Sequence, residues 1–197
     1  MTRPILNLDE LVFDTQTHGE RFEARMAPVA SRIGAAKLGY RVTQLPPGKR
    51  AWPFHSHHAN EEMIFVLEGR GRLRLADGEH PIRAGDFIAA PAGGVETAHQ
   101  IINDSDQLLT YLCVSTMIEP EVVQYPDSGK LGVIAGAAPG GAKDRRTLFW
   151  FGKTGGLQVL GGGVGAPCGA SRLPLVGLCP RSLAWQCSSV MQWTTTD

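Results

Sequence analysis

The sequence lacks a net charge, a long hydrophobic run and an apolar leader. Its nineteen Lys and Arg residues equal its nineteen Asp and Glu residues, so no overall field attracts nucleic acid or an anionic membrane. Nowhere do about 18 apolar residues run together, which argues against a membrane-spanning helix. Residues 1–14 also lack the apolar stretch of a secretory signal. We therefore expect a cytoplasmic protein with no nucleic-acid or membrane partner.

Closely paired cysteines are also missing. None of the four cysteines, Cys113, Cys168, Cys179 and Cys187, belongs to a C-x-x-C pair. This spacing argues against a zinc ribbon or a thioredoxin-like redox site. In a reducing compartment, the simplest expectation is that all four are free thiols.

Charged residues are scarce in residues 157–197. Only Arg172, Arg181 and Asp197 carry charge there, whereas three of the four cysteines fall in the same stretch. A run of three glycines at residues 161–163 would interrupt any regular element. One interpretation is a low-charge tail that packs on the domain or on a partner subunit. We prefer the hypothesis that this tail is not native to the domain, as a shifted reading frame or an unusual gene end would produce.

Short, closely spaced strands are predicted between residues 38 and 118. Arg70, Arg72 and Arg74 alternate with small or apolar residues, which is typical of a half-buried strand. Asp77-Gly78 then forms a hairpin signal. No crossover helix is visible, so a parallel α/β sheet is disfavoured and an all-β antiparallel sandwich or barrel is predicted. The expected strands are 38–45, 50–57, 62–67, 70–75, 87–90, 98–102 and 108–116.

The two flanks of this region give weaker patterns. Residues 1–37 are interpreted as an N-terminal lead-in segment, with a helical turn near residues 9–13 and a loop at residues 15–20. Residues 119–156 are interpreted as a C-terminal extension that precedes the low-charge tail. The predicted organisation is therefore one barrel, at residues 38–118, between flanking segments.

Side chains that bind metals gather in one short part of the predicted barrel. Side chains two residues apart on a strand point the same way, so His55 and His57 share a face, about 7 Å apart. Glu62 begins the next strand in phase with Ile64, whereas Glu61 has the opposite phase. Alternation alone does not decide between these glutamates, because both faces of the strand are apolar. We interpret Glu62 as the third ligand and Glu61 as solvent-facing or as an outer contact.

His99 is the fourth candidate ligand. It lies at the start of a predicted strand, and in a rolled sheet strands distant in sequence become neighbours. Three imidazoles and one carboxylate suit one divalent transition metal, such as Mn, Fe, Ni, Cu or Zn. Calcium or magnesium would require mostly oxygen ligands. Four protein ligands on an octahedral ion would leave two positions for water, substrate or dioxygen.

These residues resemble the two motifs of the cupin superfamily, and in particular small single-domain cupins of unassigned activity. The first motif, with one extra residue after its first glycine, is Gly48, His55-Ser56-His57, Glu62 and Gly69. The second, with five residues in place of two before its histidine, is Gly85, Pro91-Ala92-Gly93, His99 and Asn103. The resemblance covers about residues 38–118, and no likeness is visible past about Lys153.

The resemblance implies an antiparallel double-stranded β-helix, the cupin or jelly-roll barrel, with a metal near its centre and often a homodimer. It does not imply one activity, because related barrels serve as dioxygenases, isomerases, decarboxylases, storage proteins and ligand sensors. One hypothesis is a metal-dependent enzyme, such as a dioxygenase or isomerase, that acts on a small polar metabolite. The alternative is a non-catalytic module that binds or senses a small, sugar-like ligand. No acid or base beyond the four ligands is evident, with Glu96 the nearest candidate.

Overall fold

The structure is a computed structural model that describes residues 3–141 and 143–153. All of these residues belong to one unit of the chain, Met1–Leu157. They form strands and short 3-10 helices, and no α-helix occurs among them. The described part accordingly offers no helix with the length and hydropathy that a membrane crossing requires. The tail predicted at residues 157–197, with three of the cysteines, lies outside the described residues.

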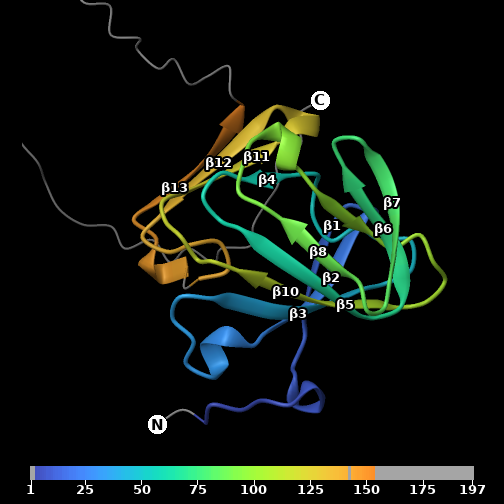
Figure 1. Cartoon of the computed structure of the whole chain (residues 1–197). Coiled ribbons are helices and arrows are strands. Elements are labelled where there is room, and N and C mark those ends of the chain that lie inside the picture. Colours follow the sequence, from blue (N-terminus) through green and yellow to red (C-terminus); the bar gives the residue numbers. More distant parts are fainter. Residues whose placement is uncertain (1–2, 142, 154–197) are drawn as a thin grey trace, which may run out of the picture. The chain divides into compact units, whose positions relative to one another are not determined.

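The elements are labelled in chain order (Figure 1). The strands are β1 (Asp14–His18), β2 (Phe22–Pro28), β3 (Gly39–Leu45), β4 (Ser56–His57), β5 (Glu62–Glu68), β6 (Arg70–Leu75), β7 (Gly78–Arg83), β8 (Phe87–Ala90), β9 (Gln100–Ile102), β10 (Leu109–Ser115), β11 (Glu121–Tyr125), β12 (Lys130–Ala135) and β13 (Leu148–Lys153). The 3-10 helices are η1 (Leu8–Glu10), η2 (Ala30–Arg32), η3 (Val95–Thr97), η4 (Pro126–Ser128) and η5 (Lys143–Arg145).

The largest sheet has six antiparallel strands in the order β1-β2-β3-β10-β5-β8. In β5, Glu62, Ile64 and Val66 are buried, while Met63, Phe65 and Leu67 are only half-buried. This alternation confirms the predicted phase of the strand, because Glu62 shares its face with the apolar residues of the core. β10 lies between β3 and β5, so the central strands of the sheet are paired on both edges.

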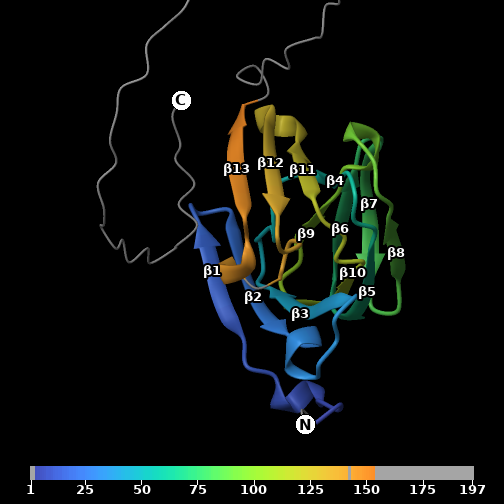
Figure 2. The same ribbon diagram turned by 90° about the vertical axis from the view of Figure 1, so that its left-hand side faces the viewer.

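Two smaller sheets complete the β-structure. One has the order β7-β6-β9, and the other has the order β13-β12-β11-β4. Figure 2 shows β13, β12 and β11 side by side. In the second sheet, Val123 of β11 pairs with His57 of β4. The strands that follow the predicted barrel therefore reach directly to a strand that carries a candidate ligand.

Two glycines of the motifs occupy turns that require them. Gly69 joins β5 to β6 with φ 86°, and a Cβ there would collide with the carbonyl oxygen of Leu108. Gly85 precedes β8 with φ 95°, and its N–H donates to the carbonyl of Val66 at 2.9 Å. The spacing of these glycines therefore reflects two chain reversals at the same end of the antiparallel β5–β8 pair, from β5 into β6 and from β7 into β8.

An apolar core fills the interior between the strands. Leu45, Val66 and Leu109 are completely buried, and each such side chain stabilises the fold by about 1.5–3 kcal/mol relative to an exposed one. Because β2, β3, β5, β6, β7, β8, β9 and β10 all contribute to one cluster, the fold is the predicted antiparallel double-stranded β-helix, or jelly-roll barrel. The cluster comprises Ala24, Met26, Leu45, Ala51, Ile64, Val66, Leu73, Ile82, Ile88, Ile101, Leu109, Tyr111 and Cys113.

The β-structure extends beyond the boundaries 38–118 that the sequence predicted for the barrel. The loop predicted at residues 15–20 is wrong for the most part, because β1 occupies it and forms a hairpin with β2. The residues of β1 are almost all exposed and polar, so the strand has no apolar face that a pattern could reveal. Residues 119–153, which belong to the predicted C-terminal extension, supply β11, β12 and β13. The predicted helical turn near residues 9–13 corresponds in part to η1.

Candidate metal centre

Backbone hydrogen bonds hold His55 and His99 opposite each other. The N–H of His55 donates to the carbonyl of His99 at 3.1 Å, and the N–H of His99 donates to that of His55 at 2.8 Å. This isolated antiparallel bridge leaves the two imidazole centroids 4.7 Å apart. The loop before His99 contains η3 and is longer than the family motif, yet it still brings His99 to this position.

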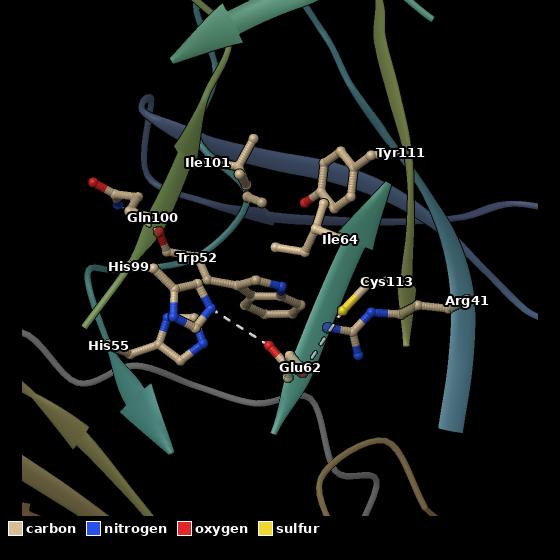
Figure 3. Close-up of a pocket in the computed structure, with 11 residues that line it drawn as sticks. Arg41, Trp52, His55, Glu62, Ile64, His99, Gln100, Ile101, Tyr111 and Cys113 are labelled. Carbon is tan, nitrogen blue, oxygen red and sulfur yellow. Dashed lines mark hydrogen bonds and ion pairs between the residues drawn. The ribbon is translucent and has the colours of Figure 1, made fainter. Parts of the chain in front are cut away.

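The carboxylate of Glu62 faces this pair from the start of β5 (Figure 3). Its Oε2 lies 3.4 Å from Nε2 of His99. One ligand atom from each of His55, Glu62 and His99 lies within 4.8 Å of the other two, and all three residues are buried. Glu61 is exposed. The structure therefore brings together three of the four predicted ligands, and their binding of a metal remains a prediction.

His57 lies beside this group rather than within it. Its Nε2 is 3.7 Å from Oε2 of Glu62, and its ring centroid is 5.0 Å from that of His55. On its other side, Nδ1 is 3.4 Å from Oε2 of Glu121, which is completely buried. Nε2 of His57 thus faces the candidate ligand Glu62, and Glu121 is placed to orient the ring from its Nδ1 side.

Glu121 and Asn60 form a buried polar cluster under the loop between β4 and β5. The Glu121 carboxylate accepts hydrogen bonds from the backbone N–H groups of Ala59 (3.0 Å) and Asn60 (3.1 Å), and from the Asn60 side chain. Asn60 also accepts a hydrogen bond from the N–H of Ile118 at 2.6 Å. This cluster ties the loop between His57 and Glu62 to β11, and it satisfies polar groups that would otherwise be costly to bury.

The protonation of the cluster follows from its burial and its charges. Burial, together with the nearby rings of His99 and His57, holds the pKa of His55 well below its usual value. Burial would raise the pKa of Glu62, but contact with His99 and the charges of His57 and Arg41 outweigh it and lower that pKa. His55 is therefore neutral and Glu62 ionised, which are the forms that bind a metal.

The donor chemistry of the site fits a divalent transition metal. Nδ1 of His55 lies 2.9 Å from the carbonyl of Pro53, so it carries the proton and Nε2 keeps its lone pair. Nδ1 of His99 is buried and makes no hydrogen bond with any other described residue, whereas Nδ1 of His57 faces the Glu121 carboxylate. Buried imidazoles with unsatisfied nitrogens around an ionised carboxylate are the ligands that first-row metals prefer.

A small pocket, partly open to solvent, adjoins the cluster. Its apolar wall includes Trp52, Ile64 and Ile101, and its polar groups include Arg41. In Figure 3 the Arg41 guanidinium extends from β3 toward Glu62. Glu96, the acid or base candidate of the sequence, is absent from the lining residues, and its carboxylate accepts the Gly94 N–H at 2.8 Å.

Sequence reasoning missed two charged residues of the site. Arg41 stands in phase with Thr43 and Leu45, whose side chains are buried, so a cation on the inner face of a strand was a signal available in the sequence. Glu121 gave no such signal, because it lies in a region of weak pattern and far from His57 along the chain. Tyr125, whose ring stacks on His55 with centroids 6.1 Å apart, was equally hidden.

Residues 41–115 match the family model described as a cupin domain. Among curated proteins, one from Methanocaldococcus jannaschii is 36% identical over 61 residues, which cover 31% of this chain and 46% of that protein. The chain spans less than half the length of the first curated relatives that it matches.

Solved structures match a larger share of the chain. A candidate sugar phosphate isomerase from Acidithiobacillus ferrooxidans has a TM-score of 0.67 and 24% identity, covering 80% of this chain and 97% of that one. A sugar phosphate isomerase of the cupin superfamily from Silicibacter pomeroyi has a TM-score of 0.65 and 26% identity, covering 78% of this chain and 94% of that one. The matched family domain contains all four candidate ligands, and the fold around them is that of these solved structures. Residues 41–115 are therefore a cupin domain.

Proposed function

We propose that the chain is a metal-dependent enzyme that acts on a small polar metabolite, with isomerisation of a sugar phosphate as its reaction. The observation that carries the proposal is the buried group of His55, Glu62 and His99 at the edge of a pocket. Buried ionisable groups that converge on a pocket are costly for stability, and such groups are concentrated at functional sites.

In this proposal, His55, Glu62 and His99 hold one divalent metal, and His57 completes the set. The ion, when bound, supplies a Lewis acid that polarises an oxygen atom of the substrate. The apolar wall of Trp52 and neighbouring residues excludes water from the substrate. Manganese, iron, nickel, copper and zinc all suit this set of ligands.

The choice of a sugar phosphate as substrate rests on the relative from Silicibacter pomeroyi. That protein is named a sugar phosphate isomerase, and the match covers 94% of its length at 26% identity. A non-catalytic module that binds or senses a small sugar-like ligand would use the same pocket without turnover. The experiment below separates these two functions.

The test begins with metal content and continues with turnover. We expect the purified, untagged chain to bind one divalent transition metal, measured by elemental analysis, and to interconvert aldose and ketose phosphates, measured by NMR. His99→Ala should abolish both properties, whereas His80→Ala, on an exposed part of β7, should leave both unchanged. Binding of sugar phosphates without turnover would favour the sensing module, and the absence of bound metal in the wild type would refute the proposal.

We further propose that the chain forms a homodimer through the outer face of β5 and β8. Met63, Phe65 and Leu67 are half-buried there, and Phe87, which is 74% exposed, packs its ring 4.4 Å from that of Phe65. Partly exposed apolar side chains gathered on one sheet face favour association. Sedimentation should give twice the chain mass, and Phe87→Lys should reduce it to that of a monomer.

A cytoplasmic location and the absence of nucleic-acid and membrane partners stay predictions.

A further inference from the structure

Arg41 is a charged side chain of the pocket that the metal centre does not use. It lies on β3, and its guanidinium carbon stands 5.7 Å from the centroid of the Trp52 ring. Its Nε is buried and has no hydrogen-bond partner in residues 3–141 and 143–153. No described carboxylate forms an ion pair with it, although the arginines of β6 all have such partners.

An arginine in this position destabilises the fold unless a partner neutralises its charge. The guanidinium carries five N–H donors in a rigid fork and remains charged at every physiological pH. Hydrogen-bond donors that are buried without an acceptor, and charges that are buried without a partner, both destabilise a fold. Trp52 stabilises the cation through its ring but accepts no N–H in the guanidinium plane. The Nε–H of Arg41 is therefore free for an acceptor that enters the pocket.

The charges of the pocket also require an anion. Among its lining residues, Arg41 is the one permanent cation and Glu62 the one carboxylate. A divalent ion held by Glu62 and the histidines would add two positive charges to this enclosed space. Even when the buried Glu121 carboxylate beside His57 is counted with Glu62, one positive charge would remain, and a negatively charged ligand would neutralise it.

We infer that Arg41 is the anion-binding subsite of this pocket, which selects a ligand with a phosphate or carboxylate group beside the metal-binding side chains. The inference rests on the proposed function and deepens it, since it restricts the substrate to an anion. Arginine binds both oxyanions through two parallel N–H···O hydrogen bonds, and Trp52 under the guanidinium keeps the plane of the fork fixed. A neutral sugar would leave this fork unsatisfied.

The first experiment titrates inorganic phosphate and, separately, acetate into the full, metal-free chain and follows binding by calorimetry. We expect Arg41→Met to weaken binding of the better anion by about tenfold or more, because it removes charge-assisted hydrogen bonds. Arg41→Lys keeps the positive charge but not the planar guanidinium, so its affinity for the anion should fall less. Arg83→Met, on the exposed surface of β7, is the matched control and should bind as the wild type does. Equal binding by wild type and Arg41→Met would overturn the inference.

A second measurement does not depend on the folding of Arg41→Met. The buried Nε–H of Arg41 should give a ¹⁵N–¹H signal that is identified by its absence in Arg41→Lys. In the wild type, this signal should shift and saturate along the same phosphate titration, and an unmoved signal would also overturn the inference. The preferred anion, phosphate or acetate, identifies the class of ligand.

Metal binding is measured in parallel, so that the two proposals can fail separately. Arg41→Met should bind a divalent metal at least as tightly as the wild type, because a neighbouring positive charge is removed. If the chain binds metal but its anion binding does not need Arg41, the subsite is refuted alone. If anion binding needs Arg41 but no metal binds to the wild type, the proposed enzyme is refuted and the subsite stands.

Discussion

The chain supports its candidate ligands in two different ways. His55 and His99 are held by hydrogen bonds between their own backbones, inside the matched cupin domain. His57 is instead faced by the Glu121 side chain, which comes from β11 outside that domain. Backbone hydrogen bonds place side chains whatever their type, whereas orientation by a carboxylate needs that particular residue. The barrel therefore positions the ligands, and the Glu121 carboxylate of β11 orients one of them.

The largest effect should come from the barrel side of this comparison. Glu62→Gln removes the one negative charge of the three-residue group, so we expect the affinity for a divalent metal to fall by more than about 100-fold, beyond the loss typical of an outer-shell residue. Competition with a coloured chelator would measure this. The matched control is Glu61→Gln on the adjacent, exposed position, which should keep its affinity. Equal losses in both variants would show that the phase of β5 does not select the ligand.

A smaller effect should come from the C-terminal side. Glu121→Gln removes the carboxylate beside Nδ1 of His57, and the loss of such an outer partner costs about 10–100-fold in metal affinity. The variant should also lower the free energy of unfolding by about 1–3 kcal/mol, because buried N–H groups of the loop lose their acceptor. Glu119→Gln, two residues before it and exposed, is the control for both measurements. Unchanged metal affinity in Glu121→Gln would mean that His57 does not need this carboxylate.

These two supports differ in how well the sequence reveals them. The fold class follows from alternation and turn signals, whereas the phase of β5 and the convergence of His55, Glu62 and His99 follow from the resemblance to the family motifs. The hairpin of β1 and β2 could not be predicted from alternation, because β1 exposes nearly every side chain. Glu121 could not be predicted as a partner of His57, because only the pairing of β11 with β4 brings the two together. A sequence pattern within one strand cannot reveal contacts that depend on which strands become neighbours in the sheet.

The pH dependence of stability should separate the two supports in the metal-free chain. Burial opposes both charges of the His57–Glu121 pair, but their mutual attraction prevails: the pKa of Glu121 is lowered from 4.5 and the pKa of His57 is raised from 6.5. The Glu121 contribution is present above pH 4.5 and is lost as the pH falls through its folded pKa. The His57 contribution is present below pH 6.5 and is lost as the pH rises through its folded pKa.

The difference in melting temperature between wild type and Glu121→Gln should therefore be largest between about pH 4.5 and pH 6.5. Melting curves in the presence of a chelator, at one-unit pH steps, would measure it. His55 differs from His57 in both respects: its pKa is lowered, and its Nδ1 lies beside a backbone carbonyl and not beside a carboxylate. A difference that keeps growing above pH 8 would contradict the ion pair.

The smallest effect should concern Cys113, which donates its thiol to Oε1 of Glu62 at 3.6 Å on the barrel side of the site. Burial, and then the charge of Glu62, raise the pKa of this thiol to about 12, so at pH 8 only about one molecule in ten thousand carries the reactive thiolate. Iodoacetamide should label Cys113 far more slowly in the native chain than in urea, as measured by peptide mass spectrometry. Glu62→Gln should speed this labelling, because the neighbouring negative charge is gone, whereas Glu121→Gln should leave it unchanged. Equal acceleration by both variants would show that the two supports are coupled and that the division between barrel and C-terminal strand does not hold.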